Sequence, residues 1–175
     1  MRSIAGSFVM LVSCLCFGAV DHTYYYSGIV HYIDLTGVAT APSDDPIILK
    51  KELLPSKGIF VETATMHDYQ GNIADLATTV NVKGNTVTSQ SPDGAIVGVG
   101  RVEGPAWDFT YLNITLSIVP TGATVKDVNY ITSNKLIARK EIDNSMGAPT
   151  LLWETDMDII SESDYLALYK KMHSH

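Results

Sequence analysis

Hydrophobic and polar residues alternate in short segments along most of the chain, from about residue 58 to residue 160. These segments, of roughly six to twelve residues, are rich in Val, Ile, Thr, Tyr and Trp. Gly, Asn, Asp and Pro separate them. A period of two is typical of strands that bury one face. The pattern therefore predicts an all-β, antiparallel sheet that meanders along the chain.

The expected strands of the meander cover residues 59–66, 73–83, 86–90, 95–103, 107–119, 123–132, 136–142 and 150–160. One further strand is expected near the N-terminus, at residues 23–33, followed by a loop at 37–46. Residues 47–54 are ambiguous, and a single helical turn packed on the barrel is one interpretation. About eight antiparallel strands with short turns close most easily as an up-and-down barrel.

The residues after the last strand predict a C-terminal α-helix packed outside the barrel. Ser161 is a suitable N-cap. Tyr165, Leu168, Tyr169 and Met172 then recur at helical spacing, which gives the helix one apolar stripe. We expect that stripe to lie against the barrel wall.

The first nineteen residues have the layout of an export signal. Met1-Arg2 is a basic start, and a nearly uncharged apolar segment runs to Phe17. This layout predicts a signal peptide over residues 1–19 rather than a membrane-spanning helix. In the alternative, Leu11-Val12-Ser13-Cys14 resembles the lipobox of bacterial lipoproteins, which implies a signal over residues 1–13 and a lipid on Cys14. Both alternatives predict an extracytoplasmic protein, either secreted or periplasmic, or anchored in the cell envelope.

Composition narrows the function classes further. The chain has a net charge of −7 and no cluster of Lys and Arg, which argues against nucleic acid and against electrostatic binding to anionic lipid. Both cysteines, Cys14 and Cys16, lie in the leader, so we expect no internal disulfide. One domain is expected over residues 20–175, with an N-terminal strand and loop at 20–57 and the barrel with its helix at 58–175.

No motif in the chain predicts catalysis. The sequence contains no P-loop, dinucleotide fingerprint or nucleophile elbow, and its five His lack the spacing of metal ligands. Glu154, Asp156 and Asp158 alternate on one face of the last strand, where a solvated outer face is expected. The alternative is an enzyme that uses these acids at the barrel mouth. We expect no enzyme activity, no metal and no cofactor.

Large side chains at alternating positions are the candidates for ligand binding. In the strand at 107–119, one face runs from aromatic to polar residues and the other is aliphatic. Aromatic walls with a few polar groups are typical of ligand pockets. The candidate ligand-binding residues are Trp107, Phe109, Tyr111, Asn113, Tyr130, Trp153 and Met157. In the alternative, the same side chains simply fill the barrel.

The strand cadence, the turns Lys83-Gly84-Asn85 and Ser91-Pro92-Asp93-Gly94, and the helix after the last strand resemble the calycin group, which includes lipocalins and fatty-acid-binding proteins. The lipocalin Gly-x-Trp motif and disulfide are missing, so the resemblance is to a divergent lipocalin-like barrel. It implies an exported protein that binds a small apolar or amphipathic ligand. The alternative function is a cell-envelope interaction or structural module with a filled barrel and no ligand.

Overall fold

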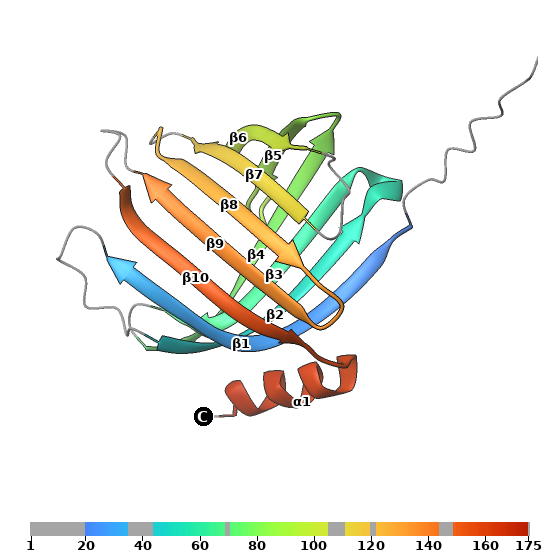
Figure 1. Ribbon diagram of the computed structural model, residues 1–175, viewed down its shortest axis with the longest axis vertical. Coiled ribbons are helices and arrows are strands. Elements are labelled where there is room, and N and C mark those ends of the chain that lie inside the picture. Colours follow the sequence, from blue (N-terminus) through green and yellow to red (C-terminus); the bar gives the residue numbers. More distant parts are fainter. Residues whose placement is uncertain are drawn as a thin grey trace, which may run out of the picture.

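The computed structural model describes residues 20–34, 44–68, 71–104, 111–119, 122–143 and 149–174. These residues form one closed antiparallel barrel and one C-terminal helix (Figure 1). The predicted leader, with Cys14, lies outside the described residues. No helix in the described ranges is long and apolar enough to cross a membrane.

The strands follow one another around the barrel in chain order, and the first pairs with the last. They are β1 (His22–Asp34), β2 (Asp44–Leu54), β3 (Ile59–His67), β4 (Ile73–Lys83), β5 (Thr86–Gln90), β6 (Ile96–Glu103), β7 (Tyr111–Ile118), β8 (Thr124–Ile131), β9 (Lys135–Asp143) and β10 (Pro149–Ile159). A short 3-10 turn, η1 (Pro55–Lys57), joins β2 to β3.

The closure of the barrel is carried by β1, which pairs antiparallel with both β2 and β10. Tyr26 is opposite Leu49 on one side and opposite Ile159 on the other. The predicted all-β, up-and-down architecture is confirmed, with ten strands in the described residues rather than about eight. Residues 20–57 contribute two of the strands that close the wall.

Beyond the eight expected strands of the meander and the one expected near the N-terminus, the additional strand is β2, for which a helical turn was one interpretation of the sequence. Its inward positions include Leu49, Lys51 and Leu53, all buried. A lysine in the middle of an apolar set hides the period of two that would have predicted a strand. The fold accommodates this lysine because Glu62 is opposite it on β3.

Two glycines fit the sheet in the way that their positions predict. Gly84 has a φ of 60° and lies in the two-residue turn between β4 and β5. At Gly100 on β6, a Cβ atom would lie 1.8 Å from the backbone oxygen of Thr115 on β7. On its other side, β6 pairs with β5, and that register is irregular between Ser89 and Gln90, as expected where the glycine-rich strand bends the sheet.

The barrel interior contains two apolar clusters. One consists of Tyr26, Val30, Ile47, Leu49, Ala64, Met66, Ile131, Leu136 and Met157. The other consists of Leu53, Phe60, Val80, Val87, Val102 and Ile114. Leu49 and Leu53, two of the inward positions of β2, fall in different clusters, and Lys51 lies between them along the strand.

The C-terminal helix α1 (Glu162–Met172) forms as predicted, with Ser161 as its N-cap. The Ser161 hydroxyl accepts a hydrogen bond from the Asp164 amide at 3.1 Å. Tyr165 is buried, and its ring centroid lies 5.1 Å from that of Tyr25 on β1. Tyr169 donates a hydrogen bond of 2.7 Å to Asp75 on β4. The helix therefore packs on the outside of the wall, near β1 and β2 (Figure 1).

Candidate functional site in the barrel interior

Four charged side chains and one amide occupy inward positions on four strands. They are Lys51 on β2, Glu62 on β3, Asp127 and Asn129 on β8, and Lys140 on β9. Lys51 is opposite Glu62 in the β2–β3 register, and Asp127 is opposite Lys140 in the β8–β9 register. Each side of the barrel therefore contributes one ion pair. We call this set of five residues the charged layer.

The two ion pairs are joined across the barrel. Lys51 Nζ lies 2.6 Å from Glu62 Oε1, and it also donates a 3.1 Å hydrogen bond to Asn129 Oδ1 on the far wall. Lys140 Nζ lies 3.2 Å from Asp127 Oδ2 and 3.8 Å from Glu62 Oε2. The Asn129 amide donates to Asp127 at 2.7 Å. Every charge of the layer thus has an opposite charge within reach.

These contacts favour the ionised forms of Glu62 and Lys140. Burial by itself would raise the pKa of Glu62, but the ammonium groups of Lys51 and Lys140 together place that pKa well below its ordinary value. Burial would lower the pKa of Lys140, and the carboxylates of Asp127 and Glu62 instead raise it. The ammonium of Lys140 also lies 5.1 Å from the ring centroid of Trp153, a cation–π contact.

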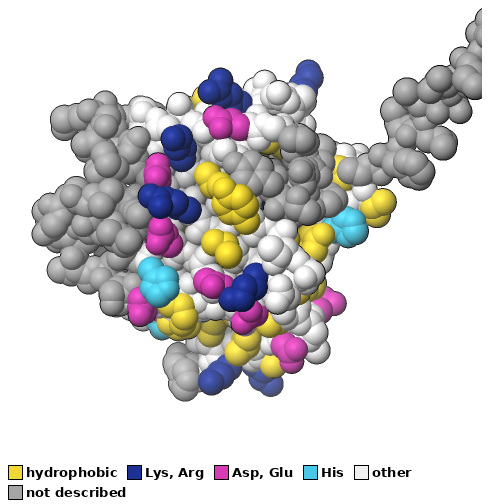
Figure 2. All heavy atoms as spheres, in the orientation of Figure 1, with side chains coloured by type: hydrophobic (Ala, Val, Ile, Leu, Met, Phe, Trp, Pro, Cys, Tyr) yellow, Lys and Arg dark blue, Asp and Glu magenta, His cyan; other side chains and the backbone are white. Residues whose placement is uncertain are grey.

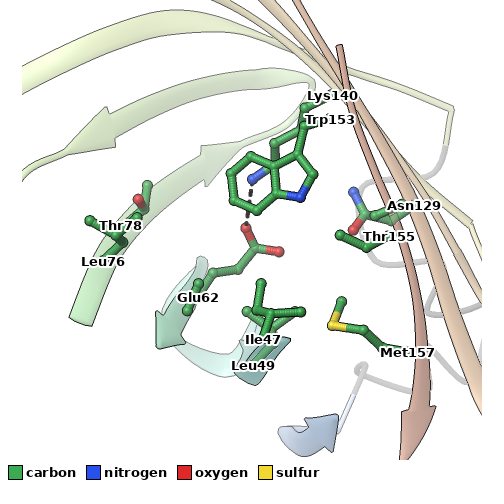
Figure 3. Close-up of a pocket in the computed structure, with 12 residues that line it drawn as sticks. Ile47, Leu49, Glu62, Leu76, Thr78, Asn129, Lys140, Trp153, Thr155 and Met157 are labelled. Carbon is green, nitrogen blue, oxygen red and sulfur yellow. Dashed lines mark ion pairs between the residues drawn. The ribbon is translucent and has the colours of Figure 1, made fainter. Parts of the chain in front are cut away.

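A cavity of about 160 Å³ lies beside the charged layer (Figure 3). Its walls are mostly apolar, and a few polar side chains lie among them. The lining residues are Ile47, Leu49, Glu62, Ala64, Leu76, Thr78, Asn129, Ala138, Lys140, Trp153, Thr155 and Met157. Figure 3 shows the Lys140–Glu62 contact next to the Trp153 ring, with Asn129 and Thr155 together on one wall and Leu76 and Thr78 across from them.

The cavity reaches solvent along β4. Leu76 lines it, yet the side chain of Leu76 is 51% exposed. In the β4–β5 ladder only Thr79 to Lys83 are paired. Among the described residues, no strand pairs with that edge of residues 73–78. At this unpaired half of β4 the cavity opens to solvent beside Leu76.

Two buried hydroxyl groups near the cavity have no hydrogen-bond partner among the described residues. One is Thr155 Oγ1, on a side chain that lines the cavity in a residue only 5% exposed. The other is Tyr26 Oη, in a fully buried residue that packs in the same cluster as Leu49 and Met157. Buried polar groups are normally hydrogen-bonded, so the Thr155 hydroxyl, at the wall of the cavity, can take a partner supplied from outside the chain.

The predicted ligand-binding residues fall in three places. Trp153 and Met157 line the cavity, on inward positions of β10. Asn113 and Tyr130 lie on the outer face instead: the Asn113 amide donates to Glu103 at 3.0 Å, and Tyr130 is 50% exposed. Trp107, Phe109 and the side chain of Tyr111 lie outside the described residues.

The outward position of Asn113 has a simple cause. The alternate positions of β7 are aliphatic, and Ile114 and Leu116 pack in the second apolar cluster. Burying the aliphatic face releases more free energy than burying the face with Asn and hydroxyl groups. The interior of β7 is therefore apolar filling, and its more polar face meets solvent.

Sequence reasoning missed the charged layer, although the sequence carries a signal for it. Lys51 and Glu62 each fall in phase with buried apolar residues of their own strand, two positions before and after. Lys140 on β9 is likewise in phase with a buried apolar residue, Leu136, four positions earlier. In-phase charges of both signs on separate strands predict interior pairs, because single buried charges are costly.

The acids considered for catalysis lie on the outer face of β10. Arg139 Nη1 lies 3.2 Å from Glu154, and Lys135 Nζ lies 2.8 Å from Asp156 and 3.8 Å from Asp158. Figure 2 shows Lys and Arg interleaved with Asp and Glu on this side of the molecule, as expected for a solvated face. Within the described ranges, no group of three or more His, Cys, Asp or Glu could hold a metal ion.

Comparisons with protein-family models, curated proteins and solved structures gave no match. The closed antiparallel barrel with one C-terminal helix is consistent with a calycin-like barrel. Function must therefore be argued from the cavity and the side chains that line it.

Proposed function

We propose that this protein is an exported, divergent lipocalin-like barrel that binds a small amphipathic molecule in its interior cavity. The observation that carries the proposal is the pairing of an apolar wall with a buried, unpartnered hydroxyl at Thr155. Trp153, Met157 and Leu49 provide apolar contact, and the polar wall orients the ligand. The opening beside Leu76 is the proposed route to the cavity.

The cavity volume limits the ligand to a small molecule. At about 160 Å³ it is smaller than the roughly 300 Å³ at which drug-sized pockets begin. An apolar cavity of about 150 Å³ in another protein holds benzene. The proposed ligand is therefore of the size of a single six-membered ring with a substituent, and a long-chain fatty acid does not fit within this volume.

The proposal includes no catalytic step. A general acid or base works best with a pKa near the operating pH. Glu62, which lines the cavity, has its pKa moved in the opposite direction, below its ordinary value. The acids on β10 are engaged by Lys135 and Arg139 at the outer surface. We therefore place the function in binding, with no cofactor, metal or nucleic acid.

The extracytoplasmic location is part of the proposal. β1 begins at His22, so removal of a signal peptide over residues 1–19 would leave every described strand intact. The intact mass of the natively exported protein tests this point. A mature N-terminus at Ala19 or Val20 supports plain export, and one at Cys14 with acyl chains supports a lipid anchor. An uncleaved N-terminus contradicts export by either route.

The binding proposal is tested by native mass spectrometry of protein purified gently from its own host. We expect an additional bound mass corresponding to a molecule of about ten or fewer non-hydrogen atoms, lost on denaturation. Substituting Trp153→Ala would enlarge the cavity, whereas Ile137→Ala on the outer face serves as a control. An empty protein that takes up none of a library of such small molecules would contradict the proposal.

The second candidate function is a cell-envelope interaction module with a filled barrel. One observation favours it: the unpaired half of β4, with the exposed Leu76, is an edge onto which an extended segment of a partner could add as a strand. This alternative predicts that an Ala77→Pro substitution, which removes an amide from the unpaired edge of β4, abolishes capture of a partner, while small molecules fail to bind. The ligand proposal predicts uptake of small molecules by the isolated protein.

A further inference from the structure

The charge balance of the barrel interior restricts the chemical class of the ligand. The charged layer contains two ammonium groups, Lys51 and Lys140, and two carboxylates, Glu62 and Asp127. Each ammonium lies within 3.2 Å of a carboxylate oxygen of the layer. Among the described residues, the layer therefore offers no unmatched charge to an incoming ion of either sign.

An ionised ligand would bring an uncompensated charge into this interior. A buried charge without a partner is strongly unfavourable, because its hydration is lost and nothing replaces it. A carboxylate could gain an ammonium only by displacing Glu62 from Lys51 or Lys140, and the displaced acid would then be the unpaired group. An ammonium ligand meets the same difficulty at the carboxylates.

The unpartnered hydroxyl groups are instead complementary to a neutral hydrogen-bonding group on the ligand. Thr155 Oγ1 can donate or accept one hydrogen bond in the wall of the cavity. Asn129 lies on the same wall (Figure 3), where its amide nitrogen donates one hydrogen bond to Asp127 and its oxygen accepts one from Lys51. The Tyr26 hydroxyl, buried in the adjoining apolar cluster, is a second group of the same kind.

We propose that the cavity selects an uncharged ligand with one hydroxyl or carbonyl group, which Thr155 binds, on an apolar body the size of one ring. This inference rests on the proposed binding function and goes beyond it by naming the ligand class. Thr155 is the residue that sets specificity for the polar group, and the charged layer excludes ions.

Isothermal titration of the full mature protein with four ring compounds of similar size tests this inference at pH 7. The probes are cyclohexanol, methylcyclohexane, cyclohexanecarboxylate and cyclohexylammonium. We expect cyclohexanol to bind most tightly and each ion to bind at least tenfold more weakly. If either ion binds as tightly as the alcohol, the inference is overturned while the proposed binding function stands. If none of the four binds, both fall.

The variants Thr155→Val and Thr155→Ser make the assignment residue-specific. Thr155→Val keeps the shape and removes the hydroxyl, so we expect the affinity for cyclohexanol to fall about tenfold, to that for methylcyclohexane. Thr155→Ser should retain the preference for the alcohol. Thr115→Val, on the outer face of β7, is the control and should bind as the parent does. An unchanged preference in Thr155→Val would overturn the role of Thr155, and circular dichroism confirms that each variant is folded.

Discussion

The ammonium nitrogen of Lys51 lies 2.6 Å from a carboxylate oxygen of Glu62, inside the barrel, where the lysine side chain has no exposed surface. This pair is linked across the interior to the opposite wall by Lys51 and Asn129. It fixes the two neighbouring strands in one register, because a slip of one strand by one residue would turn its charge to the other face and separate the pair. It also determines what the cavity beside it can accept.

Removing one member of this pair should be costly. Lys51→Met leaves Glu62 with only the more distant ammonium of Lys140, so we expect a loss of about 3–5 kcal/mol in the free energy of unfolding. The double variant Lys51→Met with Glu62→Met removes both charges and should recover most of that loss. Urea unfolding measures both. The matched control is Lys50→Met, whose partly exposed pair with Glu52 should contribute less than about 1 kcal/mol.

An equal effect of the Lys50 and Lys51 substitutions would contradict the interior placement of Lys51. If the double variant loses as much stability as Lys51→Met and Glu62→Met lose in sum, direct pairing of Lys51 with Glu62 is contradicted.

The low pKa of Glu62 predicts a loss of stability in acid. Because its folded-state pKa lies below the value of about 4.5 expected for the unfolded chain, the unfolded chain binds a proton first as the pH falls. The contribution of Glu62 is therefore complete above pH 4.5 and is lost as the pH falls toward its folded-state pKa. Urea midpoints measured from pH 7 to pH 3 should fall, and Glu62→Gln should fall less steeply. If the urea midpoints of the parent and of Glu62→Gln fall in parallel with pH, this prediction is wrong.

The close approach of β6 and β7 predicts a strong difference between two glycines. In Gly100→Ala the new methyl group would meet the backbone oxygen of Thr115 at 1.8 Å, so the strands must separate. We expect a loss of about 1–3 kcal/mol. In Gly98→Ala the nearest atom is 3.5 Å away, and the change should be neutral or slightly stabilising. Thermal unfolding compares them, and equal melting temperatures would contradict the β6–β7 register.

The docking of α1 predicts opposite outcomes for two adjacent helix residues. Tyr165 is buried against the wall, and Tyr165→Ala should cost about 3 kcal/mol or more. Leu166 is 57% exposed, and Leu166→Ala should change stability by about 0.5 kcal/mol or less. Chemical denaturation measures both. A helix that does not pack on the barrel would make the two substitutions equally mild.

Much of this fold could be predicted from local sequence, because turns and alternation are local properties. The turn at Gly84 and the cap at Ser161 each depend on a few neighbouring residues, and both lie where the sequence predicts them. The strand β2 could not be predicted in the same way. Its inward Lys51 is explained only by Glu62 on another strand, and register between strands is not a local property.

The candidate site was predictable only in part. Trp153 and Met157 reach the cavity because alternation along β10 places them inward. Which face of β7 turns inward depends on the packing of the whole barrel. The aliphatic face is buried, and Asn113 lies on the outer face. The cavity volume could not be predicted at all, since it is the small remainder after all the inward side chains have packed.

Methyl NMR of methionine-labelled mature protein tests the central claim, that a small neutral ligand binds inside the barrel. Met157 lines the cavity, whereas Met172 is on α1 outside the barrel. Titration with cyclohexanol should shift the Met157 methyl resonance, assigned with Met157→Leu, and leave that of Met172 in place. A saturable shift confined to Met172, or no shift of either methyl group, would contradict binding in the interior.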